Sequence, residues 1–340
     1  MKKGIIILAI VSFFALGTTV IDSNQFDRPE HFPKPIYDFQ NNPLTASGVD
    51  LGRALFYDPI LSIDNTISCA SCHSPYNAFA HTDHDLSHGI NDKIGRRNAP
   101  ALFNLAWQES FMWDGAVNHL DMQALAPISH PDEMGENISN VVEKLQNQKI
   151  YPPLFYAAFG DSTVTGEHTL QALSQFQLTL ISANSKYDKV IKGKLQYEEK
   201  EKKGYKIFQE NCNSCHTEPL FSSYGFARNG LQIDTTLNDM GRMEISNHKA
   251  DSLLFKIPSL RNLSYTYPYM HDGRFRRLKD VVNHYNSIPE KANNASEELR
   301  NIKQLTPNEQ KELIAFLLTL NDTSFVFDKT NKFPVEILKY

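Results

Sequence analysis

The chain contains 340 residues, of which 41% are hydrophobic and 21% are charged, and its formal net charge is −5. This length and apolar content suffice for two domains, each with its own core. The slightly acidic balance lacks the basic excess of nucleic-acid-binding proteins, so nucleic acid is not an expected partner.

The N-terminus has the pattern of a secretory signal. Lys2 and Lys3 precede an apolar run from Ile5 to Leu16, which is short for a membrane span. We therefore expect residues 1–22 to be a signal peptide and the protein to be exported to the periplasm. No clean small-residue cleavage site follows the run, so an uncleaved N-terminal anchor is the alternative.

Helical signals dominate the rest of the chain, and alternating strand patterns are nearly absent. A short helix is predicted over 51–57, and it ends there because Asp58 precedes Pro59. Apolar spacing and capping residues predict further helices at 138–145, 167–181, 204–212, 278–285 and from Thr306 onward. Residues 81–97 have no apolar period and are expected to form a long loop. The sequence therefore predicts a mainly α fold.

Two short motifs use all four cysteines of the chain. They are Cys69-Ala-Ser-Cys72-His73 and Cys212-Asn-Ser-Cys215-His216. Cys-x-x-Cys-His attaches c-type haem, because the two thiols form thioethers to the haem and the histidine ligates its iron. We therefore predict two covalent haems, one in residues 23–190 and one in residues 191–340.

One zinc site built from all four thiolates is the alternative, but it leaves unexplained why histidine follows the second cysteine both times. Outside these two motifs, the sequence shows no repeat strong enough to relate the two halves.

Further motifs surround the haem motifs. In the first half they are Arg97-Asn98-Ala99-Pro100, Phe111-Met112-Trp113-Asp114-Gly115, Gln123, Pro127 and Glu133-Met134-Gly135. In the second half they are residues 255–262 and 268–274. Their order and spacing resemble bacterial di-haem cytochrome c peroxidases and the related MauG-like proteins. The resemblance implies two cytochrome c-like haem domains packed around an inter-domain interface.

The resemblance also implies roles for three residues near the first haem. Glu133 matches the distal carboxylate of the peroxidatic haem, Gln123 its distal neighbour, and Trp113 the residue between the haems. A positioned carboxyl group can take and return the proton that peroxide cleavage moves. The ordinary alternatives are a helix-start residue for Glu133 and core packing for Trp113.

Further ligands follow from the same resemblance. His88 is a candidate ligand of the first haem in the resting state, with a solvated loop histidine as the alternative. Asn98, Thr266 and Pro268 match a calcium site between the domains, where oxygen ligands suit Ca²⁺. A turn stabilised by asparagine and proline would explain these three residues equally well.

The sixth ligand of the second haem is expected to be Tyr285. This position follows the Thr266-x-Pro268 segment at the distance where family peroxidases carry methionine and MauG-like proteins carry tyrosine. A buried core tyrosine fits the helix pattern too, and Met270 is the competing ligand.

The resemblance implies a cytochrome c peroxidase that reduces hydrogen peroxide to water. Electrons from a small cytochrome or cupredoxin would enter at the second haem and reach the first through Trp113. A MauG-like oxidase acting on a partner protein and a non-enzymatic di-haem electron carrier are the alternatives. Family peroxidases are often homodimers, so a homodimer is a further expectation.

Overall fold

The computed structural model describes residues 26–289, 292–300 and 302–338. The predicted signal peptide or anchor, residues 1–22, lies outside these ranges. No helix in the described part of the chain is long and apolar enough to cross a membrane.

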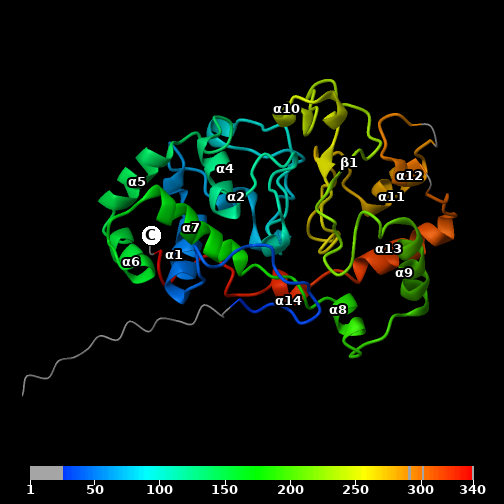
Figure 1. The fold of residues 1–340 in the computed structure, drawn as a ribbon, viewed down its shortest axis with the longest axis horizontal. Helices are drawn as coiled ribbons and strands as arrows, with labels where there is room; N and C mark the ends of the chain where they lie inside the picture. The colour runs from blue at the N-terminus through cyan, green and yellow to red at the C-terminus, as the bar shows by residue number, and fades with distance from the viewer. Residues whose placement is uncertain (1–25, 290–291, 301, 339–340) are drawn as a thin grey trace, which may run out of the picture.

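The fold is mainly α, as predicted, and its two halves lie side by side (Figure 1). The helices of the first half are α1 (Ala46–Tyr57), α2 (Cys69–Cys72), α3 (Leu120–Gln123), α4 (Leu125–Ser129), α5 (Ile138–Asn147), α6 (Tyr151–Phe159), α7 (Gly166–Leu178) and α8 (Lys186–Ile191). Short 3-10 turns lie at Pro59–Leu61, Pro75–Asn77, Ile90–Asp92 and Leu105–Trp107.

The second half continues the helical pattern. Its helices are α9 (Glu199–Asn211), α10 (Met243–Ser246), α11 (Leu278–Asn286), α12 (Glu297–Arg300), α13 (Pro307–Leu318) and α14 (Thr323–Val326), with a 3-10 turn at Lys249–Asp251. Strands β1 (Phe226–Ala227) and β2 (Phe255–Lys256) pair antiparallel, with Phe226 opposite Lys256.

Helix ends agree with the capping chemistry of the sequence. Thr306 and Glu309 form the predicted capping box at the start of α13, each side chain accepting from the other's backbone N–H. Helix α1 ends at Tyr57 as expected before Asp58-Pro59. It begins earlier than predicted, because Thr45 caps it by accepting from the backbone N–H of Gly48 at 3.0 Å.

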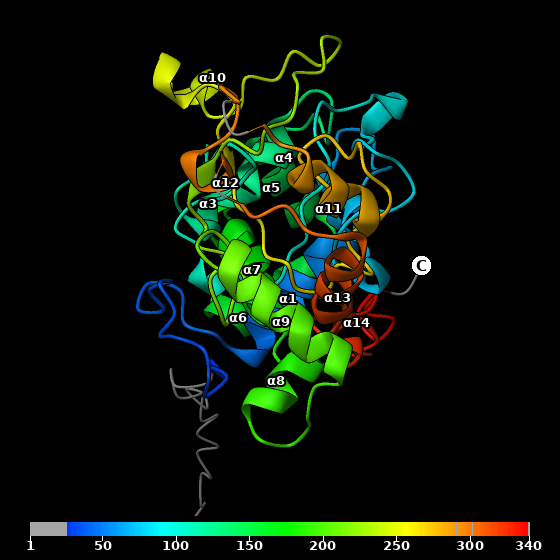
Figure 2. The same ribbon diagram turned by 90° about the vertical axis from the view of Figure 1, so that its right-hand side faces the viewer.

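Each half is organised around one pair of crossing helices, α1 with α7 and α9 with α13 (Figure 2). A glycine lies at each crossing. A Cβ atom on Gly52 would lie 1.9 Å from the carbonyl oxygen of Ala172, and one on Gly204 would lie 1.9 Å from that of Glu312. Only glycine therefore allows the two backbones of each pair to approach so closely.

The last segment of the chain returns to the first half. Phe325, Val326 and Leu338 belong to the apolar core formed by α1 and α7. The Tyr57 hydroxyl donates to the backbone oxygen of Asn331 at 2.6 Å. Residues after α13 therefore join the two halves, while the predicted boundary near residue 190 stays a prediction.

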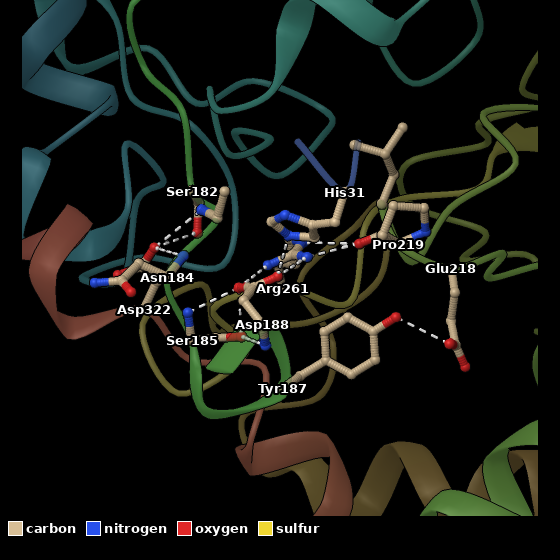
Figure 3. A network of polar contacts seen from close by, with 12 residues as sticks. His31, Ser182, Asn184, Ser185, Tyr187, Asp188, Glu218, Pro219, Arg261 and Asp322 are labelled. Atoms are coloured by element: carbon tan, nitrogen blue, oxygen red, sulfur yellow. Dashed lines mark hydrogen bonds and ion pairs between the residues drawn. The ribbon is translucent and has the colours of Figure 1, made fainter. Parts of the chain in front are cut away.

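A buried ion pair joins the halves a second time (Figure 3). Arg261 donates to both carboxylate oxygens of Asp188 at 2.8 Å, and neither side chain is exposed. His31, from the N-terminal lead-in, donates to the same carboxylate at 2.8 Å. Burial alone would raise the pKa of Asp188, but the hydrogen bonds from Arg261 and His31 outweigh it and lower that pKa.

Candidate haem centres

The first motif lies on α2, and His73 directly follows that helix. The Nδ1–H of His73 donates to the backbone oxygen of Phe79 at 2.9 Å, which leaves Nε2 as the free ring nitrogen. Burial lowers the pKa of His73 to about 4, so the imidazole is neutral at physiological pH. A neutral, oriented imidazole is the form that ligates a metal.

The second motif lines a cavity of about 270 Å³. His216 Nδ1 lies 3.2 Å from the backbone oxygen of Phe221 and 3.1 Å from that of Pro258, so Nε2 is again free. Burial lowers the pKa of His216 to about 4. The cavity walls are largely apolar and include Phe103, Leu263, Val282, Leu313 and Leu317.

Both centres fit a covalently attached haem. In each, a fully buried phenylalanine with a left-handed backbone supplies the carbonyl that orients the histidine, with φ of 59° at Phe79 and 55° at Phe221. The four cysteines form no disulfide. No group of three or more His, Cys, Asp or Glu residues in the described ranges could hold a metal ion, which argues against the four-thiolate zinc alternative.

Glu133 lies beside the first motif, in the turn that follows α4. Its charge raises the pKa of the Cys69 and Cys72 thiols, although burial raises them more, so its carboxyl group is close to both. Burial raises the pKa of Glu133 itself. Within the described residues the structure gives this side chain no hydrogen bond, so its carboxyl group is available to another molecule.

The turn around Glu133 is held by neighbouring segments. The backbone oxygen of Glu133 accepts from the N–H of Ile90 at 2.8 Å, and that of Met134 accepts from Ile63 at 3.0 Å. Buried Glu136 pairs with Lys144 at 2.8 Å. Hydrogen bonds from two neighbouring segments therefore hold the backbone that carries the Glu133 carboxyl group.

Gln123 ends α3, and its amide donates to the sulfur of Met112 at 3.7 Å. Trp113 follows Met112 in the chain, and both line the cavity of the second motif. Its indole N–H donates to the backbone oxygen of Asn98 at 2.8 Å. A first-half segment, residues 112–113, therefore forms part of the wall of the second cavity.

His88 lies in the loop beside the first motif, where its backbone oxygen accepts from the thiol of Cys72 at 3.4 Å. Its ring stacks on His84 with 4.1 Å between centroids, and its Nδ1 lies 3.0 Å from Asp92. The sequence analysis singled out His88 alone, whereas the loop brings His81 and His84 to the same cluster. The chain order His-x-x-His-x-x-x-His was the available signal.

The remaining predicted ligands gather around the cavity of the second motif. Asn98, Thr266 and Pro268 line it, as do Met270 and Tyr285. Burial raises the pKa of Tyr285, and the charges of Cys212 and Cys215 raise it further, which places its hydroxyl near both cysteines. The cavity therefore contains both candidate sixth ligands.

Comparison with known proteins agrees with this arrangement. The family model "Di-haem cytochrome c peroxidase" matches residues 46–196, and the model "Cytochrome c" matches residues 201–321. The methylamine utilization protein MauG of Methylophilus methylotrophus is 33% identical, covering 93% of this chain and 95% of that protein. The cytochrome c551 peroxidase of Nitrosomonas europaea is 32% identical, and the match covers 82% of this chain and 81% of that protein.

The chain belongs to the di-haem cytochrome c peroxidase and MauG family. A solved MauG-like protein associated with microbial copper homeostasis has the same fold, with a TM-score of 0.81 at 29% identity, over 91% of this chain and 98% of that one. The protein is therefore an oxidoreductase with two cytochrome c-like domains and two haems.

The family architecture shows a repeat that the sequence analysis missed. Residues 97–120 align without gaps to residues 255–278, and the shared residues include Pro100 with Pro258, Leu102 with Leu260, Asn104 with Asn262, Met112 with Met270, and Gly115 with Gly273. The backbone repeats as well, with φ of 67° at Met112 and 74° at Met270. The signal was present as Pro-x-Leu-x-Asn followed by aromatic-Met-x-Asp-Gly, but these segments are separated from the cysteine motifs by loops of unequal length.

The two repeat segments also form backbone hydrogen bonds with each other, across the interface between the halves. The N–H of Asn98 donates to the backbone oxygen of His271 at 2.7 Å, and the N–H of Lys256 donates to that of Trp113 at 2.7 Å. In the alignment Asn98 corresponds to Lys256, and Trp113 corresponds to His271. The two contacts are therefore equivalent, and the interface has approximate two-fold symmetry.

Continuing the same register pairs Tyr285 with Pro127. Proline has no side-chain donor atom, whereas tyrosine offers a phenol oxygen. The two centres thus differ in the residue available at one equivalent position.

Proposed function

We propose that this protein is a periplasmic di-haem peroxidase that reduces hydrogen peroxide to water with electrons from a small cytochrome or cupredoxin. The observation that carries the proposal is the Glu133 carboxyl group, which is half-buried, free of hydrogen bonds to described residues, and adjacent to the first haem motif. A carrier of electrons needs no such group, because both of its irons keep protein ligands.

When bound, the haem at the first motif supplies the iron at which peroxide is reduced. Glu133 can take the proton from the inner oxygen of peroxide and return it to the outer oxygen as the O–O bond breaks. Its raised pKa suits this exchange, because a carboxyl group that is a weak acid gives and takes a proton at similar cost.

Two further features support the assignment of this half as the peroxide site. In the register of the repeat, Pro127 offers no iron ligand where the second half offers Tyr285, so this position would not block peroxide from the first haem. The family resemblance gives Gln123 as the distal neighbour of that haem, where its amide N–H can donate to a bound oxygen atom without ionising.

Trp113 and the calcium residues complete the proposal. Trp113 lines the second cavity from a first-half segment, so it is the aromatic group suited to pass electrons from the second centre to the first. Asn98, Thr266 and Pro268 all line that cavity, and they would hold one calcium ion between the domains. We further propose the homodimer expected from the family.

A MauG-like oxidase that acts on a partner protein is the second candidate. Tyr285 in the second cavity favours it, because a phenolate ligand stabilises ferric and higher states, whereas a thioether such as that of Met270 favours ferrous iron. The relative from Methylophilus methylotrophus covers nearly the whole chain, which supports the same candidate.

The test is a redox titration of the purified protein carrying both haems, with and without peroxide. We expect peroxide to change the spectrum of the first haem only, and turnover with a reduced cytochrome after pre-reduction. Absence of turnover with every reduced donor, together with a peroxide response, would favour the MauG-like candidate. If neither haem responds to peroxide, the remaining candidate is a non-enzymatic di-haem electron carrier.

A further inference from the structure

The strongest unexplained polar contact between the halves is made by Arg97. Its Nε and Nη2 donate to the two carboxylate oxygens of Asp239 at 2.6 and 2.8 Å, and its Nη1 donates to Asp114 at 2.5 Å. The Asp239 and Asp114 side chains are only 2% and 9% exposed. Burial would raise the pKa of Asp239, but the contacts with Arg97 lower it.

Arg97 and Asp114 are the sequence neighbours of the two residues that form the Trp113 indole hydrogen bond. Asp114 directly follows Trp113, and Arg97 directly precedes Asn98, whose backbone oxygen accepts the indole N–H at 2.8 Å. Arg97 therefore holds both ends of this hydrogen bond. It directly precedes Asn98, which accepts the bond, and it binds Asp114, which directly follows the donor Trp113.

The repeat shows the same device in the second half. Phe255 is the counterpart of Arg97, and His271 is the counterpart of Trp113. The Phe255 and His271 rings stack with 3.7 Å between centroids and 15° between planes. The position of Arg97 in the repeat therefore contacts the interface residue directly in the second half, through Phe255, and indirectly in the first half, through Asp114 next to Trp113.

We propose that Arg97 is the positioning residue that holds Trp113 between the two haem centres, and that it does so by joining Asp114 of the first half to Asp239 of the second. The proposal rests on the electron-transfer role given to Trp113 under the proposed function. Its consequence is that the placement of Trp113 depends on correct docking of the halves, because Asp239 belongs to the other half.

The experiment uses the full protein with both haems and the variant Arg97→Gln. The matched control is Arg96→Gln, because Arg96 is the adjacent arginine and its ion pair with Glu244 leaves it 53% exposed. Rapid mixing measures electron transfer from the reduced second haem to the first. Ultraviolet resonance Raman spectroscopy reports the indole hydrogen bonds, with Trp107, which donates to Pro33 at 2.9 Å, as internal reference.

We expect Arg97→Gln to slow transfer between the haems by about 10-fold or more, since displacements near 1 Å have effects of roughly 10²-fold on positioned reactions. The Trp113 indole band should shift while the Trp107 band stays, and Arg96→Gln should change neither. Arg97→Lys should recover part of the rate, because lysine keeps the charge but not the fork that reaches both carboxylates.

An unchanged rate and an unchanged Trp113 band in Arg97→Gln would overturn the inference. Trp113→Phe separates this failure from failure of the proposed function: if Trp113→Phe is slow while Arg97→Gln is normal, only the role of Arg97 is wrong. If Trp113→Phe transfers at the wild-type rate, the electron-transfer role of Trp113 is wrong. Should Arg97→Gln fail to fold, Asp239→Asn removes the same contact more gently, and a normal rate in that variant would also overturn the inference.

Discussion

The two halves of this protein share one architecture and differ at a few equivalent positions near the candidate haem centres. Each has a crossing helix pair with an obligatory glycine, a Cys-x-x-Cys-His motif whose histidine donates Nδ1–H to a backbone carbonyl, and one copy of the aligned segment. The differences lie at equivalent positions: Pro127 against Tyr285, Trp113 against His271, and Phe103 against Arg261. Both halves thus keep the same haem-attachment motif, and under the proposed function the substitutions at these positions distinguish the peroxide site from the electron-transfer site.

The largest expected effect is loss of a haem from one half. Cys69→Ala should remove or cripple the first haem and Cys212→Ala the second, because each thiol forms one thioether bond. Mass spectrometry and pyridine haemochrome spectra measure the haem content of each variant. A variant that keeps two haems, each attached by two thioethers, would contradict the assignment.

Glu133→Gln tests whether the first half alone carries acid–base chemistry. Glutamine keeps the shape but cannot exchange the proton, so peroxide turnover should fall by roughly 10²- to 10⁴-fold. Both haems should remain attached, and reduction of the second haem by the donor should be unchanged. Near-normal turnover would return Glu133 to a structural role at the turn after α4.

Tyr285→Phe tests whether Tyr285, which aligns with Pro127 of the first half, is the sixth ligand of the second haem. We expect the ferric spectrum of the second haem to change in Tyr285→Phe and to stay unchanged in Met270→Leu, because only the phenol oxygen is the expected ligand. The reciprocal variant Pro127→His should introduce a ligand at the first haem and suppress its reaction with peroxide, with Pro127→Ala as the control. If only Met270→Leu alters the second haem, methionine is the ligand and the plain peroxidase gains support.

The variant Arg261→Met tests the role of a charged residue at a repeat position where the first half has the apolar residue Phe103. Its counterpart Phe103 is buried in an apolar core, whereas Arg261 pairs with Asp188, so Arg261→Met leaves a buried carboxylate without its main partner. Breaking such a pair costs about 3–5 kcal/mol, measurable by denaturant unfolding. Phe103→Leu should cost less, because it changes only packing.

The same pair predicts a pH dependence. The pKa of Asp188 is lower in the folded protein than in the unfolded chain, where it is about 3.9. Its contribution to stability is therefore fully present above that value and is lost as the pH falls through the lower, folded-state pKa. The loss should be smaller in Asp188→Asn, and an identical acid-unfolding curve in that variant would contradict the assignment.

Much of the site could be predicted from local sequence, because its chemistry is local. Cys-x-x-Cys-His places two thiols and an imidazole within one turn, and the Thr306 capping box needs only four residues. Positions that depend on distant partners were harder to predict. The His81, His84 and His88 cluster and the Arg97–Asp239 pair form only when loops without apolar periodicity fold against other segments.

Short motifs with fixed spacing predicted the haem attachment points and the family, and apolar periodicity with capping residues predicted the mainly α fold. The folded structure was needed to see that Asn98 contacts His271 and that Lys256 contacts Trp113. It also showed that residues after α13 return to the first core and that Trp113 lines the second cavity. These are contacts between segments far apart in the chain. Their geometry depends on how two apolar cores pack against each other, and no local pattern of residues records that packing.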